Sequence, residues 1–288
     1  MAQAREKVRY FDFPKHNEEF CVEGVVARIV RSVEGGPIRQ MGTTGSTKPT
    51  GTFISVKGGS RAMPWESMKC ELPTLELAEV ASPVVSLMAQ PHRLELFVRR
   101  RRDPLVCLPD LELTVESSVF SRLMDGQPFA DAMIQWRPDP KRSTGHRTIV
   151  VEVKDDDDPR KDDPDYQRKL DLAAKVYRGI GIGFLVIVRS RDLACVDLDL
   201  VHDVALENYT RVSPVDVDVC MRWLSDSDGV GRLGGLVTRL GGGATGREKA
   251  SALHVRRVIS IDLSQGFLPS TPVALVSPMA SHRQSKVA

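Results

Sequence analysis

The stretch from Thr148 to Asp155, TIVVEVKD, constrains the fold more than any other part of the chain. Four apolar or β-branched residues predict a buried strand, and the strand ends in an acid, a valine and a lysine. Glu152 and Lys154 stand two residues apart, so their side chains share one face of the strand. Because a lone charge is costly to bury, both groups need partners or water. Other parts of the chain must supply those partners.

Strand and helix patterns alternate around this stretch and predict a mixed α/β core over about 64–200. The segments SPVVSLMAQP, HRLELFVRRRR and LVCLPDLELTV predict one strand each, and IGFLVIVRS predicts a strand covered on both faces. SSVFSRLMDGQPFADAMIQW predicts helix on both sides of its Gly-Gln-Pro break. The clearest helix is DYQRKLDLAAKVYRGIG, with Gly179 as its stop, and a helix over 64–80 should break or kink at Pro73.

Changes in composition divide the chain into three regions. Residues 1–60 contain a Gly/Ser/Thr/Pro-rich stretch, which predicts a partly irregular N-terminal extension, and residues 61–205 are expected to form the α/β domain. Residues 206–288 predict short helices followed by the strands ISIDL and PVALV, an order typical of a smaller winged-helix-like domain with a flexible tail. GLVTRLGGGATG lacks the lysine of a phosphate-binding loop and is expected to be a loop between helices.

The composition excludes several classes of protein. A hydrophobic content of 41% and a charged content of 27% are ordinary for a soluble globular protein. No run approaches the ~20 apolar residues that span a bilayer, so we expect no membrane association. Five single cysteines without metal-binding spacing predict a reducing, cytoplasmic location. The net charge of +2 is too small for a protein that finds DNA unaided.

Acidic residues at strand ends predict a site for Mg²⁺ or Mn²⁺, because hard divalent cations prefer carboxylate and carbonyl oxygens. Asp110 opens the strand in LPDLELTV, and its carboxylate would lie next to Glu152 if the two strands are neighbours. The carbonyl of Val153 could add another oxygen ligand. Such an ion activates water for attack on a phosphodiester, and Lys154 would hold that water.

The motif Pro109-Asp110 followed by Glu152-Val153-Lys154 resembles that of PD-(D/E)xK nucleases. More narrowly, roughly residues 52–198 resemble TnsA-type endonucleases of heteromeric transposons, through FISVKGGSRAMPWES, Glu71, VVSLMAQP, LPDLEL, VVEVKDDDD and the helix that follows. The resemblance implies a restriction-endonuclease-like mixed sheet flanked by helices. It also implies that Glu71, Asp110 and Glu152 bind the metal and that Lys154 is catalytic.

Two departures from the family pattern leave alternatives open. The interval between Asp110 and Glu152 is long and holds an apparent helical insertion, so Asp131 competes with Asp110 for the aspartate role. In the same way, Glu66 competes with Glu71 as the helix-borne ligand.

The resemblance further implies cleavage of the 5′ end, the non-transferred strand, at transposon ends. A DDE-type transposase would join the 3′ end, and an AAA+ ATPase regulator would be the second protein partner, met by the C-terminal domain. The implied location is a bacterial cytoplasm, at the nucleoid during transposition. Two alternatives remain: a nuclease of the same fold in restriction or repair, and a non-catalytic DNA-binding adaptor.

Clusters of basic residues are candidates for contact with the DNA backbone, because phosphate binding relies on them. Arg99, Arg100, Arg101 and Arg102 fall at a predicted hairpin, and Arg168 and Lys169 lie one turn into the helix that begins near Tyr166. For Arg256 and Arg257, contact with protein and contact with DNA are both open. The aspartates that follow Lys154 are expected to form a solvated acidic loop.

Overall fold

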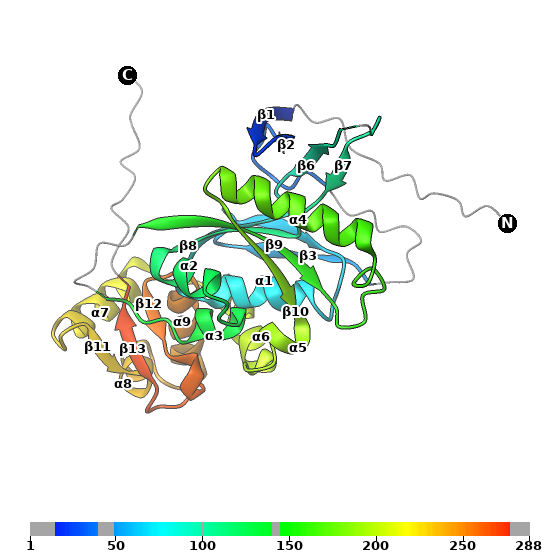
Figure 1. The fold of residues 1–288 in the computed structure, drawn as a ribbon. Coiled ribbons are helices and arrows are strands. Elements are labelled where there is room, and N and C mark those ends of the chain that lie inside the picture. Colours follow the sequence, from blue (N-terminus) through cyan, green and yellow to red (C-terminus); the bar gives the residue numbers. More distant parts are fainter. Residues whose placement is uncertain (1–14, 40–48, 100, 140–144, 277–288) are drawn as a thin grey trace, which may run out of the picture. The chain divides into compact units, whose positions relative to one another are not determined.

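The computed structural model of the chain describes residues 15–39, 49–99, 101–139 and 145–276 (Figure 1). The fold is mixed α/β, as expected, with several sheets and helices. The chain forms two compact units, of which the first holds residues up to Leu75, Ser86–Thr114 and Arg147–Ser190. The second holds Glu76–Val85, Val115–His146 and the residues from Arg191 onward. The units therefore interleave along the chain.

The first four-stranded sheet begins within the N-terminal extension, which we expected to be only partly irregular. Its strand order is β1 (Lys15–Val22), β2 (Val25–Ser32), β6 (Arg93–Phe97) and β7 (Leu105–Cys107), and every pair is antiparallel. Glu23 and Gly24 connect β1 to β2 with φ angles of 48° and 78°. A two-residue loop with positive φ at both positions closes a tight hairpin. The N-terminal extension is thus part of a sheet over residues 15–32.

The second four-stranded sheet has the order β10 (Gly183–Val188), β9 (His146–Lys154), β8 (Leu111–Glu116) and β5 (Val84–Ala89), and β10 runs parallel to β9. LVCLPDLELTV was expected to be one strand but forms β7 and β8, in different sheets. Pro109 lacks the N–H that a continuous ladder requires. β10 is an edge strand with four of its six residues half-buried, so the expectation of cover on both faces was wrong.

Helix α1 (Glu71–Val80) is shorter than expected, because residues 61–65 form strand β4 (Arg61–Trp65), paired with β3 (Gly51–Ser55). Pro73 therefore lies in the first turn of the helix and does not interrupt it. A missing N–H costs no hydrogen bond at that position, since the first four N–H groups of a helix have no intrahelical acceptor.

Helix α4 (Pro164–Gly179) confirms the clearest helix of the sequence and ends at the expected glycine. In Figure 1 it lies between the strands of the two four-stranded sheets. A single buried cluster contains residues of both sheets and of α4: Ala27, Ile29, Leu94, Leu96, Cys107, Val150, Ala173, Val176 and Tyr177. Burial of each large apolar side chain contributes ~1.5–3 kcal/mol, so this cluster fixes α4 on the sheets.

The first unit also contains a buried polar network beneath α4. His92 is fully buried, and its Nε2 lies 2.6 Å from the hydroxyl of Tyr177. Its Nδ1 lies 3.4 Å from Glu112 Oε2, and Arg31 donates two hydrogen bonds to the same carboxylate at 2.7 and 3.2 Å. Burial lowers the pKa of His92, which favours a neutral ring. The network thus gives His92 Nε2 and the Glu112 carboxylate partners inside the protein, whereas His92 Nδ1 makes no hydrogen bond to the described residues.

In the second unit, α2 (Ser117–Met124) and α3 (Phe129–Ile134) confirm the helices expected on either side of the Gly-Gln-Pro break. The remaining helices are α5 (Arg189–Asp192), which starts in the first unit, α6 (Leu198–Leu206), η1 (Glu207–Tyr209), α7 (Pro214–Ser225), α8 (Leu233–Arg239), α9 (Gly243–Val255) and η2 (Leu263–Gln265). A three-stranded antiparallel sheet has the order β11 (Val230–Arg232), β13 (Pro272–Leu275) and β12 (Ile259–Ile261). The expected strands ISIDL and PVALV are therefore present.

The stretch GLVTRLGGGATG is largely helical, which corrects the expectation of a loop. Its first five residues belong to α8 and its last four to α9, with a short turn over residues 240–242 between them. Leu233, Leu236 and Leu240 recur at helical spacing and are all buried, so their burial outweighs the low helix propensity of glycine.

Arg256 and Arg257 contact protein groups within the second unit. Arg256 Nη2 donates to the carbonyl of Thr210 at 2.6 Å. Arg257 donates to the carbonyl of Ser82 and to the carboxylate of Glu116, both at 2.7 Å. These contacts connect the end of α9 to segments far away in the sequence. They help to explain why those segments belong to the second unit together with α9.

Gly246 permits the close approach of α8 and α9. A Cβ at this position would lie 2.3 Å from the carbonyl oxygen of Val237 and 3.0 Å from its Cγ1. We expect Gly246→Ala to lower the free energy of unfolding by about 1–3 kcal/mol, because backbone must move to admit the methyl group. Urea denaturation measures this change. Gly36→Ala is the control, since its Cβ would meet nothing within 4 Å, and equal stability of the two variants would contradict the prediction.

Candidate active site

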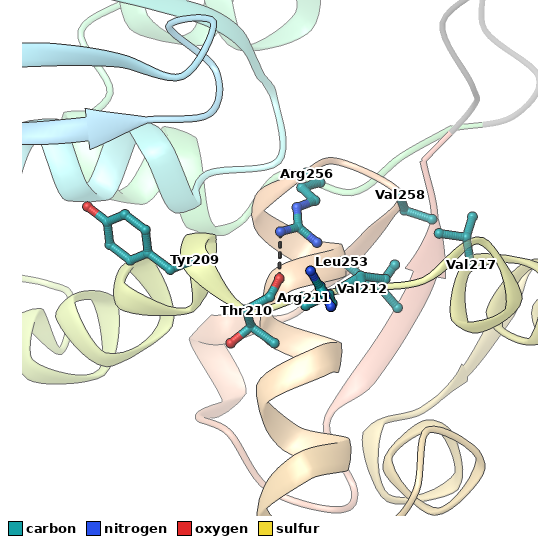
Figure 2. Close-up of a pocket in the computed structure, with 8 residues that line it drawn as sticks. All are labelled: Tyr209, Thr210, Arg211, Val212, Val217, Leu253, Arg256 and Val258. Atoms are coloured by element: carbon teal, nitrogen blue, oxygen red, sulfur yellow. Dashed lines mark hydrogen bonds between the residues drawn. The ribbon is translucent and has the colours of Figure 1, made fainter.

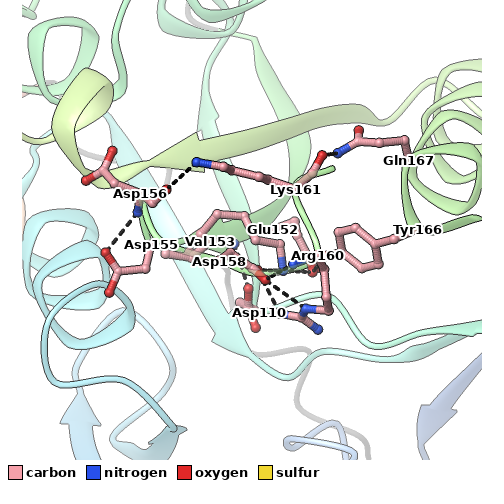
Figure 3. Close-up of polar contacts among 11 residues, drawn as sticks. Asp110, Glu152, Val153, Asp155, Asp156, Asp158, Arg160, Lys161, Tyr166 and Gln167 are labelled. Atoms are coloured by element: carbon pink, nitrogen blue, oxygen red, sulfur yellow. Dashed lines mark hydrogen bonds and ion pairs between the residues drawn. The ribbon is translucent and has the colours of Figure 1, made fainter. Parts of the chain in front are cut away.

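Strands β8 and β9 bring Asp110 next to the charged end of β9 (Figure 3). The N–H of Asp110 donates to the carbonyl of Val151 at 3.0 Å, and the N–H of Val153 donates to Asp110 Oδ2 at 2.6 Å. Asp110 is thus bound to β9 through both its backbone N–H and its side-chain carboxylate. This placement agrees with the expectation that the carboxylate lies at the end of the sheet beside Glu152.

Glu152 and Lys154 share one face of β9, as expected, while Val153 is buried on the other with 7% of its surface exposed. Lys154 Nζ donates to Glu152 Oε1 at 2.6 Å and lies 3.6 Å from Asp158 Oδ2. The two side chains are 11% and 13% exposed, so their pairing is shielded from most of the solvent. These contacts supply the partners that the strand sequence required.

Glu71 is the first residue of α1, and its Oε2 accepts a hydrogen bond from the N–H of Glu66 at 2.8 Å. Burial raises the pKa of Glu71 to about 7, against the opposing effect of Arg39, and the carboxylate of Glu152 raises it further. Glu66 instead forms an ion pair with Arg39. The structure therefore places Glu71 in the electrostatic field of Glu152, whereas the Glu66 carboxylate pairs with Arg39.

Asp110 completes a group of three acids that repel one another. Burial raises the pKa of Asp110 well above its usual value, and the nearby carboxylates of Glu152 and Glu71 raise it further. The N–H of Val153 and the ammonium of Lys154 oppose the shift. Burial disfavours the charged form of Glu71 and of Asp110, and the neighbouring carboxylates disfavour it further. A bound cation would favour the charged form of each acid.

Asp131 lies in the second unit, on α3, where its Oδ1 accepts a hydrogen bond from Gln135 Nε2 at 3.0 Å. It contributes to none of the pKa shifts of Glu71 or Asp110. Of the two aspartates left open by the sequence, Asp110 is therefore the one that the structure groups with the other acids.

The donor chemistry of the cluster suits Mg²⁺ or Mn²⁺, because all three side chains offer carboxylate oxygens. Each has one oxygen engaged: Asp110 Oδ2 by Val153, Glu71 Oε2 by Glu66, and Glu152 Oε1 by Lys154. The second oxygen of each makes no hydrogen bond to the described residues. Within those same residues, however, no three His, Cys, Asp or Glu side chains form a closed ligand set. Metal binding would therefore require the free oxygens to turn toward one another.

Tyr166 is a partner of Glu152 that sequence reasoning missed. Its hydroxyl donates to Glu152 Oε1 at 2.8 Å, across fourteen residues of sequence. Asp163 caps α4 by accepting the N–H of Asp165 at 2.9 Å and that of Tyr166 at 3.4 Å. The Asp-Pro pair before the helix is a readable cap signal. It fixes where the first turn begins, although it does not reveal which strand that turn faces.

The acidic stretch after β9 is only partly a solvated loop. Asp158 is buried and accepts three hydrogen bonds from Arg160, through its N–H at 2.9 Å, Nε at 3.0 Å and Nη2 at 2.9 Å. These bonds lower the pKa of Asp158 to about 2. Asp158 therefore anchors the loop beside Lys154, which corrects the expectation for this residue.

The candidate DNA-contacting residues fall in two places in the first unit. Arg99, Arg101 and Arg102 are exposed in the connection between β6 and β7, whereas Arg100 lies outside the described residues. The hairpin was expected, and Arg99, Arg101 and Arg102 lie between its two strands. Arg168 is exposed on α4, and Lys169 Nζ donates to the carbonyl of Val106 at 3.3 Å.

A separate open groove of about 470 Å³ lies in the second unit (Figure 2). Residues 209–212 line one side, and Leu253 and Arg256 line the other. Its described lining contains no carboxylate, histidine or cysteine, so it offers neither ligands for a cation nor a general base.

Comparison with protein-family models gives no match for this chain, and comparison with curated protein sequences gives none either. None of the helices in the described residues has the length and apolarity needed to cross a membrane.

Proposed function

We propose that the protein is a metal-dependent DNA endonuclease with a restriction-endonuclease-like core. Its role would be to cut the 5′, non-transferred strand at transposon ends, as one subunit of a heteromeric transposase. The observation that supports the activity most directly is the convergence of Glu71, Asp110, Glu152 and Lys154, from one helix and two neighbouring strands. The resemblance to TnsA-type endonucleases supports the choice of substrate.

In this proposal Glu71, Asp110, Glu152 and the carbonyl of Val153 would hold Mg²⁺ or Mn²⁺. When bound, such an ion polarises the phosphodiester and lowers the pKa of a water molecule. The ammonium of Lys154 is positioned by Glu152 to orient the attacking water. The carboxylates would exchange mutual repulsion for attraction to the cation.

The DNA backbone would contact the arginine run 99–102, of which Arg99, Arg101 and Arg102 are exposed, and the basic residues Arg168 and Lys169 of α4. These groups belong to the same compact unit as the carboxylates. Phosphate contacts of this kind position a duplex without reading its sequence. The small net charge of +2 favours delivery by a partner over unaided binding.

The C-terminal region supports the proposal of a winged-helix-like domain. Its elements follow the order α7, β11, α8, α9, β12 and β13, and the three strands form one antiparallel sheet. By the resemblance, this domain would meet an AAA+ ATPase regulator, while the nuclease core works beside a DDE-type transposase at the bacterial nucleoid.

The decisive experiment compares cleavage of a labelled transposon end with and without a DDE transposase encoded beside this chain. Mg²⁺-dependent cutting of the 5′ strand only when the transposase is present would support the proposal. Cutting by the isolated protein would favour a nuclease of restriction or repair. No cutting in either case, with DNA binding retained, would favour the non-catalytic adaptor.

A further inference from the structure

Tyr166 connects the carboxylate cluster to the basic helix α4. Only 8% of the residue surface is exposed, and its hydroxyl donates to Glu152 Oε1 at 2.8 Å. Lys154 Nζ donates to that same oxygen at 2.6 Å. One oxygen of Glu152 therefore receives two donors, and the other receives none from the described residues. Two fixed donors hold the orientation of a carboxylate more firmly than one.

The ring of Tyr166 lies among three cations. Lys154 Nζ is 5.0 Å, Lys169 Nζ 4.8 Å and Arg160 Cζ 4.9 Å from the ring centroid. Cations within ~6 Å of an aromatic face are attracted by its quadrupole. Three like charges around one ring also repel one another, so their placement needs compensation.

Within the part of the chain that the structure describes, two of the three cations have a carboxylate partner. Arg160 and Lys154 both lie near Asp158, at 2.9 and 3.6 Å, and Lys154 also pairs with Glu152. Lys169 makes one hydrogen bond, to the carbonyl of Val106, and no ion pair with the described residues. It lies one turn after Tyr166, on the same side of the helix. The Tyr166 ring thus holds the Lys169 ammonium, which is not paired with a carboxylate of the described residues.

We propose that Tyr166 is a positioning residue of this site, with two separable roles. Its hydroxyl turns Oε1 of Glu152 toward Lys154 and so leaves Oε2 for the metal ion. Its ring holds Lys169 ready for a DNA phosphate. The inference rests on the proposed nuclease function and adds to it a residue that touches neither metal nor substrate.

The first role is tested with Tyr166→Phe, which removes the hydroxyl and keeps the ring. Titration of the purified protein with Mg²⁺ in a calorimeter, without DNA, is expected to show a metal affinity about 10- to 100-fold lower, as for other residues that orient a metal ligand. The dissociation constant for a duplex, measured in EDTA, should stay within about twofold, because the cations around the ring remain.

Tyr177→Phe is the matched control for this variant. Tyr177 lies on the same helix, is buried, and also loses one hydrogen bond, to His92 at 2.6 Å. Its hydroxyl does not touch the carboxylate cluster. We expect Tyr177→Phe to keep the Mg²⁺ affinity of the parental chain, even if its melting temperature falls as much as that of Tyr166→Phe.

The second role is tested with Tyr166→Leu, which removes both hydroxyl and ring. This variant should lose Mg²⁺ affinity as Tyr166→Phe does, and should also bind a duplex about 10-fold more weakly in EDTA, since one phosphate contact is lost. The slope of affinity against salt concentration should fall by about one charge for Tyr166→Leu only.

Equal Mg²⁺ affinity in the parental chain and in Tyr166→Phe would overturn the role of the hydroxyl. Equal DNA affinity in Tyr166→Phe and Tyr166→Leu would overturn the role of the ring. A parental chain that binds no Mg²⁺ would overturn the proposed function, and the inference with it. Loss of Mg²⁺ affinity in Tyr177→Phe as well would show a general effect of destabilising α4 and would also contradict the inference.

Discussion

Replacement of Lys154 by alanine is expected to lower the rate of 5′-strand cleavage by about 10²–10⁴-fold, the range for loss of a positioned proton-transfer group. Lys154 supplies the ammonium next to the carboxylate cluster, at 2.6 Å from Glu152. Glu152→Ala should give a loss at least as large, because it removes an expected metal ligand. In a complete transposition assay, both variants should convert cut-and-paste products into co-integrates, since only the 3′ ends would be cut.

Lys161→Ala is the control for this experiment. Lys161 is an exposed lysine from the loop that follows β9, and its Nζ donates to the backbone carbonyl of Asp156 at 3.4 Å. The variant should keep parental activity. Circular dichroism and the melting temperature establish that Lys154→Ala is folded. A folded Lys154→Ala protein that still cuts the 5′ strand would rule out a catalytic lysine and would favour the adaptor alternative.

The sequence predicted the part of the site that depends on local geometry. A two-residue period places Glu152 and Lys154 on one face of any strand, and the apolar residues before them predict where that strand is buried. The structure bears out both points. The pairing of Asp110 with this strand was also correct, because an acid at the start of one strand reaches the end of a neighbour.

The parts that the sequence left open depend on tertiary contacts. Asp110 and Asp131 are both acids near an apolar segment of the sequence. The two candidates are distinguished by a tertiary contact, because Asp110 accepts a hydrogen bond from the N–H of Val153 and Asp131 accepts one from Gln135. Tyr166 could not be assigned to Glu152, because no local rule gives the angle between α4 and β9. The hairpin over 15–32 was missed since its short apolar run was read together with the glycine-rich stretch that follows.

Asp110→Asn is expected to stabilise the metal-free protein by about 1–3 kcal/mol at pH 8, although it should abolish cleavage. The asparagine can still accept the hydrogen bond from the N–H of Val153 through its Oδ1, and it removes a charge that Glu71 and Glu152 repel. The pKa of Asp110 is raised in the folded state. The folded protein therefore holds this proton more tightly than the unfolded chain, and stability falls as the pH rises from about 4 through the folded pKa.

Asp110→Asn should thus raise the free energy of unfolding more at pH 8 than at pH 5. Urea unfolding in EDTA at each pH measures this difference. Asp131→Asn is the matched control, because its side chain accepts from Gln135 and lies on α3 in the second unit. Its stability should change by less than about 0.5 kcal/mol, as for most substitutions outside the core, and cleavage should persist. The opposite result, in which Asp131→Asn stabilises the protein and Asp110→Asn does not, would contradict the prediction. It would identify Asp131 on α3, and not Asp110, as the aspartate of the site.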